Sequence, residues 1–273
     1  MKVLIAADME GISGVVHWDH VSSTHKEYAR FRRMMTADVN AAISGALEAG
    51  ADEVVVTDGH GGAKNILIEE LDARARLNSG SARPLAMVQG IDAGVDAAMF
   101  VGYHAHAGTT NAILDHTWSG RVSNVWLNGT LVGEIGLNAA VCGHFGVPVT
   151  MISGCRGACD EARALLGDVE TAVVKWASGR MGAECLPPVV AQQAIHDAAL
   201  QAVQCFQAGQ APAPLQIETP VTLVVEFGHS DMVDPVAIMP GVQRQGRQVT
   251  LTAEDMPTAY RLFRVVATLA SSA

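Results

Sequence analysis

Two carboxylates follow the first apolar run of the chain. Asp8 and Glu10 come directly after Val3–Ala7, at the point where a buried strand would end. Residues two positions apart in an extended segment point to the same side, so both carboxylates face one way while Met9 turns towards the core. Two bare carboxylates held side by side need a positive charge between them. Asp8 and Glu10 therefore indicate a cation-binding site.

Polar side chains also follow two later apolar runs. His60 ends the segment Asp58-Gly-His60 after Glu53–Thr57, and His104 follows Ala97–Gly102. The carboxyl ends of parallel strands meet at one edge of a sheet, where open α/β sheets bind their ligands. Taken singly, such residues are more often helix caps or loop histidines. Their recurrence after three predicted strands favours a metal site.

A hairpin signal precedes one further acidic residue. Asn128-Gly129 lies at the centre of the apolar segment Val125–Val132, a pattern typical of a type I′ turn. Glu134 follows this hairpin and begins the next predicted helix, where a carboxylate can simply stabilise the helix dipole. Its place after the hairpin matches that of Asp8 and His60 after their strands, so Glu134 is also a candidate ligand.

The pattern of apolar residues predicts the helices and strands that would position these candidate ligands. Helices are predicted at Tyr28–Ala49, Ile66–Leu71, Ile135–Phe145, Gly157–Leu166, Pro187–Gln207 and Asp255–Ala270. Strands are predicted at Val3–Ala7, Glu53–Thr57, Ala97–Gly102, Val147–Ser153, Thr171–Lys175 and Val221–Phe227. Most of these strands are apolar on both faces, as parallel strands covered by helices are. The expected fold is α/β, a three-layer αβα sandwich with a mainly parallel sheet.

A change in composition suggests how the chain is divided. The segment Gln207–Leu215 is rich in Gly, Pro and small residues and precedes the strands Val221–Phe227 and Gln248–Thr252. We expect a metal-binding α/β catalytic part over residues 1–210 and a smaller C-terminal α+β part over residues 211–273. The two parts can pack together as one domain.

Composition excludes several classes of partner. The 273 residues are 49% hydrophobic, enough for a large core, and the net charge of −10 gives no basic surface for nucleic acid. No apolar stretch reaches the roughly 20 residues that span a bilayer, so no membrane association is expected. The five cysteines show no disulfide pattern, and Cys155 and Cys159 lack a second pair for zinc. We expect buried thiols in a cytoplasmic protein.

Several motifs resemble those of the D-aminopeptidase family of dinuclear zinc peptidases, and they span most of the chain. They are Asp8-Met-Glu-Gly-Ile-Ser-Gly14, Asp58-Gly-His60, Gly102-Tyr-His104, His116, Gly133-Glu-Ile-Gly-Leu-Asn138, Val174-Lys175 with Arg180, Val225-Glu-Phe227, Met239-Pro-Gly241 and Glu254-Asp-Met256. The resemblance implies a zinc-dependent aminopeptidase that removes the N-terminal residue from short peptides, with a preference for D-amino acids. It also implies a ring-like homo-oligomer.

The resemblance further implies a role for each matching position. Two zinc ions bind each subunit and Asp8 bridges them. One ion is held by Glu10 and His60, and the other by His104 and Glu134. Such a pair of ions activates a bridging water and stabilises the oxyanion. His116 matches the catalytic histidine of the family. It would either accept the proton of the water or donate a hydrogen bond to the developing charge.

Other residues near these motifs have weaker cases. Asp58 is a candidate acceptor for the outer nitrogen of a ligand histidine, and His106 is a weaker one. Asp115 lies beside His116 in a segment of mixed polarity that is typical of a loop over a site. Lys175 and Arg180 are candidates to bind a substrate carboxylate, although surface cations near a helix start are common.

Two alternative functions use the same residues. A dinuclear metal hydrolase of another amide or ester would have the same ligands and a different pocket. A nucleotide-binding regulatory domain would use the turn Asp58-Gly-His-Gly-Gly62 to hold a phosphate. The second alternative is disfavoured because neither a Walker pattern nor a G-x-G-x-x-G fingerprint follows a strand.

Overall fold

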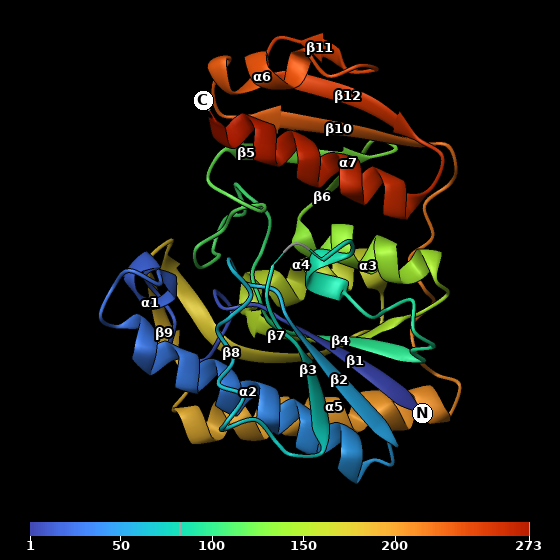
Figure 1. Cartoon of the computed structure of the whole chain (residues 1–273). Coiled ribbons are helices and arrows are strands. Elements are labelled where there is room, and N and C mark those ends of the chain that lie inside the picture. The colour runs from blue at the N-terminus through green and yellow to red at the C-terminus, as the bar shows by residue number, and fades with distance from the viewer. Residues whose placement is uncertain (82, 273) are drawn as a thin grey trace.

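The computed structural model describes residues 1–81 and 83–272 and contains two sheets (Figure 1). The larger sheet has seven strands in the order β3-β2-β1-β4-β7-β8-β9. Its strands are β1 (Lys2–Ala7), β2 (Glu53–Asp58), β3 (Ala75–Asn78), β4 (Ala97–Tyr103), β7 (Val149–Cys155), β8 (Glu170–Gly179) and β9 (Gly182–Cys185). All neighbouring pairs are parallel except β8 and β9.

Helices cover both faces of this sheet. α2 (Tyr28–Glu48) and α5 (Pro188–Gln207) pack against each other and against one face, while α3 (Glu134–His144) and α4 (Arg156–Leu166) pack against the other (Figure 1). Strands β4 and β7 are buried along their whole length because both of their faces are covered. The predicted three-layer αβα sandwich with a mainly parallel sheet is confirmed.

The second sheet is antiparallel and has the order β11-β12-β10-β5-β6. Its strands are β5 (Val122–Leu127), β6 (Thr130–Val132), β10 (Val221–Phe227), β11 (Gln243–Gln245) and β12 (Gln248–Ala253). The predicted hairpin is confirmed: Asn128 and Gly129 connect β5 to β6 with φ of 47° and 85°. Helix α7 (Met256–Leu269) packs on β10 and β12 and contacts α3.

This hairpin links the two halves of the chain. It lies within residues 1–210, yet β5 pairs with β10 from the C-terminal part. The C-terminal sheet therefore includes a segment from the first part, and the boundary at residue 210 stays a prediction. The remaining short elements are α1 (Trp18–Val21), η1 (Ala86–Val88), η2 (Asp231–Val233), α6 (Asp234–Ala237) and η3 (Ala270–Ser272). Among the described residues, no helix is long and apolar enough to cross a bilayer.

The predicted helix at Ile66–Leu71 is wrong, because this segment forms turns and loop. Two of its backbone amides donate hydrogen bonds to side chains outside the segment. The carboxylate of Asp58 accepts from the Ile66 amide at 2.9 Å, and the hydroxyl of Thr36 accepts from the Leu67 amide at 3.0 Å. An amphipathic spacing alone cannot reveal such competition, because its acceptors come from β2 and α2.

Candidate metal centre

The strand ends bring the predicted site residues to one edge of the larger sheet. Asp8 and Glu10 follow β1, His60 follows β2 and His104 follows β4 directly. Glu134 is the first residue of α3, which the β5–β6 hairpin leads into. Parallel pairing of β1 with β2 and β4 aligns their carboxyl ends, since Ala7 pairs with both Asp58 and Val101. Side chains that are far apart in sequence therefore meet here.

The carboxylate of Asp8 lies between two histidines. Its Oδ1 is 3.4 Å from Nδ1 of His60, and its Oδ2 is 3.3 Å from Nε2 of His104. Glu10 lies on the first side, 3.0 Å from Nδ1 of His60, and Glu134 lies on the second, 3.1 Å from Nε2 of His104. Each oxygen of Asp8 thus faces one imidazole, and each of these imidazoles also lies beside one further carboxylate.

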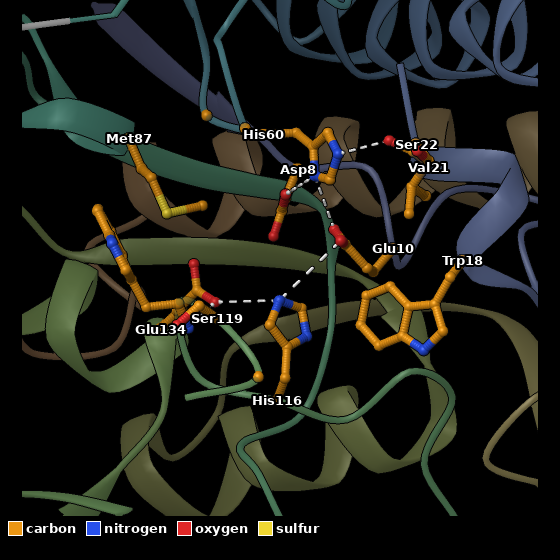
Figure 2. A pocket seen from close by; sticks show the side chains of 14 residues that line it. Asp8, Glu10, Trp18, Val21, Ser22, His60, Met87, His116, Ser119 and Glu134 are labelled. Atoms are coloured by element: carbon orange, nitrogen blue, oxygen red, sulfur yellow. Dashed lines mark hydrogen bonds and ion pairs between the residues drawn. The ribbon is translucent and has the colours of Figure 1, made fainter. Parts of the chain in front are cut away.

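His116 completes the cluster from the segment between β4 and β5. Its Nε2 is 3.8 Å from Oε1 of Glu134 and 4.0 Å from Oε1 of Glu10. Its ring stacks on that of His104 with centroids 3.9 Å apart. Figure 2 shows His60 and His116 on opposite sides of the converging carboxylates of Asp8, Glu10 and Glu134.

Each histidine has one nitrogen fixed by a backbone carbonyl. Nε2 of His60 donates to the carbonyl of Val21 at 3.0 Å, and Nδ1 of His104 donates to that of Ala105 at 3.0 Å. A carbonyl can only accept, so the outer nitrogen keeps its proton. The other nitrogen then carries a second proton towards the carboxylates or, in the neutral ring, has a lone pair available for a metal ion. Outer hydrogen bonds of this kind orient metal-ligating histidines.

The donor set fits a divalent metal ion. Nε2 of His104 is buried and, among the described residues, has no aligned hydrogen-bond partner, although two carboxylates lie beside it. Ligand atoms of Asp8, Glu10 and His104 lie within 4.8 Å of one another, and so do those of His104, His116 and Glu134. Carboxylate and imidazole without thiolate suit zinc. The division of ligands between two ions, which the family resemblance implies, stays a prediction.

The charges of the cluster shift its pKa values in compensating directions. Burial raises the pKa of Asp8, but the imidazoles of His104 and His60 outweigh burial and hold that pKa well below its usual range. Burial lowers the pKa of His60 and of His104, but the adjacent carboxylates raise both well above the ordinary value. Without a metal ion, protons on the histidines therefore balance the buried carboxylates.

Lys175 on β8 holds the loop that carries Glu10. Its side chain is fully buried, and its ammonium donates to the carbonyls of Glu10, Ile12 and Val15 at 2.6, 2.9 and 2.6 Å. Burial lowers the pKa of Lys175 to about 8, so the ammonium form still predominates at pH 7. The sequence analysis considered Lys175 as a contact for a substrate carboxylate, and this is wrong, because all three of its donors serve the loop.

Two proposed partners of ligand histidines also have different roles. Asp58 does not contact the ring of His60; its carboxylate accepts from the backbone and side-chain nitrogens of Asn65 at 2.6 Å each. Asn65 in turn donates to the carbonyl of His60 at 2.7 Å, so Asp58 fixes the loop rather than the imidazole. Nδ1 of His106 donates to the carbonyl of Ala107 at 2.8 Å.

A cavity of about 420 Å³ opens over the cluster. Charged and polar side chains on one side of it are those of Asp8, Glu10, Glu134, His60 and His116. Its apolar side includes Trp18 and Met87, which Figure 2 shows on opposite sides of the carboxylates. Neither Lys nor Arg occurs among the described residues that line it. The cavity is therefore suited to a small ligand that carries a positive charge.

Comparisons with known proteins agree with this site. A family model described as D-aminopeptidase matches residues 1–265. The chain is similar to the D-aminopeptidase of Bacillus subtilis (strain 168), with 35% identity over 272 residues, 99% of this chain and 98% of that protein. It is also similar to the solved structure of the Zn-dependent D-aminopeptidase DppA from Bacillus subtilis, a self-compartmentalizing protease. That match has a TM-score of 0.96 and 34% identity, and covers 100% of this chain and 99% of that one.

Replacing Lys175 tests whether it holds the Glu10 loop. Lys175→Met leaves three buried carbonyls without donors, and we expect a loss of about 2 kcal/mol or more of unfolding free energy, since each unsatisfied group costs roughly 1–3 kcal/mol. Zinc affinity should fall as well, because Glu10 is released. Thermal unfolding and zinc titration measure the two effects. Lys26→Met, at an exposed lysine, is the control. A Lys175→Met protein with unchanged stability and zinc affinity would contradict the assignment.

Proposed function

The chain belongs to the D-aminopeptidase family, and from this we propose that it is a zinc-dependent aminopeptidase that removes the N-terminal residue from short peptides, with a preference for D-amino acids. The observation that carries the proposal is the position of Asp8, whose two oxygens face His60 and His104 at 3.4 and 3.3 Å. One carboxylate between two sets of ligands is what a shared pair of metal ions requires.

We assign the ligands accordingly. Asp8 would be shared by two zinc ions in each subunit, Glu10 and His60 would complete the ligands of one ion, and His104 and Glu134 would complete those of the other. Zinc bound there would supply an activated water and would polarise the scissile carbonyl. The buried carboxylates and the fixed histidine tautomers support this assignment, because they present oxygen atoms and lone pairs to the same small volume.

His116 is the proposed acid–base residue. Its Nδ1 donates to the carbonyl of Leu114 at 2.8 Å, which leaves Nε2 of the neutral ring free to accept a proton in the cavity. His116 then either takes the proton of the attacking water or, once protonated, donates a hydrogen bond to the developing oxyanion. Both roles use the same nitrogen, which faces Glu10 and Glu134.

The cavity supports an exopeptidase acting on short peptides. The free N-terminal amine of a peptide could bind one of the zinc ions as a neutral ligand, and no Lys or Arg among the described lining residues would repel the amine in its charged form. A volume of about 420 Å³ holds only a few residues. We further propose a ring-like homo-oligomer in the cytoplasm, because the similar DppA is a self-compartmentalizing protease. The free cysteines are consistent with a reducing compartment.

Activity on matched stereoisomers tests the function. We expect the purified protein to release alanine faster from D-alanyl-D-alanine than from L-alanyl-L-alanine, to lose this activity on chelation and to regain it with zinc. Preference for the L-peptide would keep the metallopeptidase and revise its specificity. Cleavage of neither peptide would favour a dinuclear hydrolase of another amide or ester.

Zinc binding should release protons. The raised pKa values of His60 and His104 mean that both rings are protonated at pH 7 without metal. Each ring must lose this proton to bind zinc, so filling the site should release protons at pH 7, and apparent zinc affinity should rise with pH. Calorimetric titration in buffers of different ionisation enthalpy measures the release. His196→Asn, at a histidine whose side chain is paired with Glu48 and Asp197, should release the same number. Zinc binding without proton release would refute the assigned ligands.

Two substitutions separate metal binding from turnover. Asp8→Ala should lose both zinc ions and activity while the protein stays folded. His116→Ala should keep its zinc and lose about 10²–10⁴-fold in kcat, the usual contribution of general acid–base catalysis. Metal analysis and peptide hydrolysis check both variants, with His229→Ala at an exposed histidine as the control. Normal turnover by His116→Ala would show that its catalytic role is wrong.

A further inference from the structure

Arg180 lies in the turn between β8 and β9 and forms hydrogen bonds with the segment that carries His116. Its Nε donates to Oδ1 of Asp115 at 2.8 Å, and its Nη2 donates to the carbonyl of Asp115 at 2.6 Å. Its own carbonyl accepts from the amide of Leu114 at 2.8 Å. Three hydrogen bonds therefore join one residue to the two positions that precede the proposed acid–base histidine.

These contacts reach the imidazole through one residue. Leu114 receives the hydrogen bond of Nδ1 of His116 on its carbonyl, and its amide is bound by Arg180. Leu114 has a φ of 49°, a left-handed conformation that leucine rarely adopts, so contacts from outside the segment must hold it. Oδ2 of Asp115 also accepts a hydrogen bond from the amide of Gly108 at 2.7 Å, so Asp115 additionally connects the residues just before His116 to an earlier part of the same segment.

Arg180 also supports the other side of the His116 ring. Its guanidinium lies 5.5 Å from the centroid of the Trp18 ring, a cation–π distance. Trp18 lines the cavity and meets His116 at 5.3 Å between ring centroids, with the rings 74° apart. The imidazole is thus held between Trp18 and the stacked ring of His104.

A direct contact between Arg180 and substrate fits the structure less well. The guanidinium is already paired with Asp115, so its charge is neutralised before a substrate carboxylate arrives. Arg180 is also not among the described residues that line the cavity. Its donors face the segment of His116, which indicates a role in orientation.

We propose that Arg180 is a positioning residue that sets the orientation of His116 and the place of Trp18 at the cavity wall. It acts on the turnover step and leaves zinc binding unchanged, because its described contacts go to the segment that carries His116 and to Trp18, and to none of the proposed zinc ligands. This proposal rests on the proposed function, since it assigns Arg180 to the step in which His116 moves a proton.

Steady-state kinetics of Arg180→Ala on D-alanyl-D-alanine test the proposal. We expect kcat to fall about 10- to 100-fold, as displacement of a catalytic group by about 1 Å does, while KM stays within about threefold. Zinc content should equal that of the wild type. Guanidinium ion added to the assay should restore part of the lost kcat of Arg180→Ala. It should restore nothing to His116→Ala, which lacks the group that Arg180 orients.

The matched control is Arg156→Ala. Arg156 is paired with Asp160 at 2.9 Å on the surface of α4, and its side chain is 54% exposed, close to the 50% of Arg180. Removing the Arg156 pair, which is exposed on both sides, should lower the melting temperature by about 4 °C or less. Arg180→Ala should lower it further, because the carboxylate of Asp115 that loses its partner is only 12% exposed. Arg156→Ala should keep the wild-type kcat, because the hydrogen bonds described for Arg156 go to Asp160 and none goes to Leu114, Asp115 or His116. Asp115→Asn should lower kcat, and adding it to Arg180→Ala should cause little further loss, because the two residues act as one unit.

Three results would overturn the proposal. A rise in KM for D-alanyl-D-alanine but not for its C-terminal amide, with kcat unchanged, would make Arg180 a contact for the substrate carboxylate. A fall in kcat that matches a loss of zinc or of folded protein, without rescue by guanidinium, would make its role structural. Wild-type kinetics in Arg180→Ala would remove any role.

The orientation of His116 can also be judged without turnover. If the wild type cleaves no peptide, the proposed function fails, and the NMR signals of the His116 ring nitrogens, assigned by their loss in His116→Ala, decide the question. Arg180→Ala should shift and broaden these signals, whereas Arg156→Ala should not. Unchanged signals in Arg180→Ala would overturn the positioning role independently of the enzyme's substrate.

Discussion

Three carboxylates buried side by side at one sheet edge are the constraint on which the rest of the structure depends. Asp8, Glu10 and Glu134 are each at most 5% exposed, and their mutual repulsion is poorly screened there. Positive charge must enter the cluster, either as protons on His60 and His104 or as metal ions. The raised pKa values of the two histidines show that the protein attracts this charge strongly. The similar protein DppA is a Zn-dependent D-aminopeptidase, and such an enzyme is a natural setting for this cluster.

The fold supplies the rigidity that the cluster requires. Three parallel strands fix the starting points of the ligand loops, and backbone carbonyls fix the outer nitrogens of the histidines. Behind the site, β8 contributes no proposed ligand, yet Lys175 on this strand holds the Glu10 loop. Arg180, just beyond the end of β8, holds the segment of His116. Strand β8 thus supports both the metal side and the acid–base side of the centre.

The sequence predicted what local pattern and strand ends determine. Asp8, His60 and His104 could be found because each follows an apolar strand, and the Asn128-Gly129 turn could be found because its conformation favours these residues. The role of Lys175 could not be predicted, because its acceptors are backbone carbonyls about 160 positions away that any residue would supply. Its burial was the missing signal, since a lysine at the end of a predicted strand usually reaches solvent. The helix predicted at Ile66–Leu71 is wrong for the same reason: side chains distant in sequence accept hydrogen bonds from the amides of this segment.

The central claim is that the carboxylate of Asp8 joins two zinc sites. Diffraction data from zinc-loaded crystals, collected on both sides of the zinc absorption edge, test it most directly. The account predicts two anomalous peaks in each subunit, with one oxygen of Asp8 at about 2.0–2.2 Å from each peak, the distance for zinc and carboxylate. One peak should lie beside His60 and the other beside His104. A single peak, or peaks that Asp8 does not contact, would contradict the account.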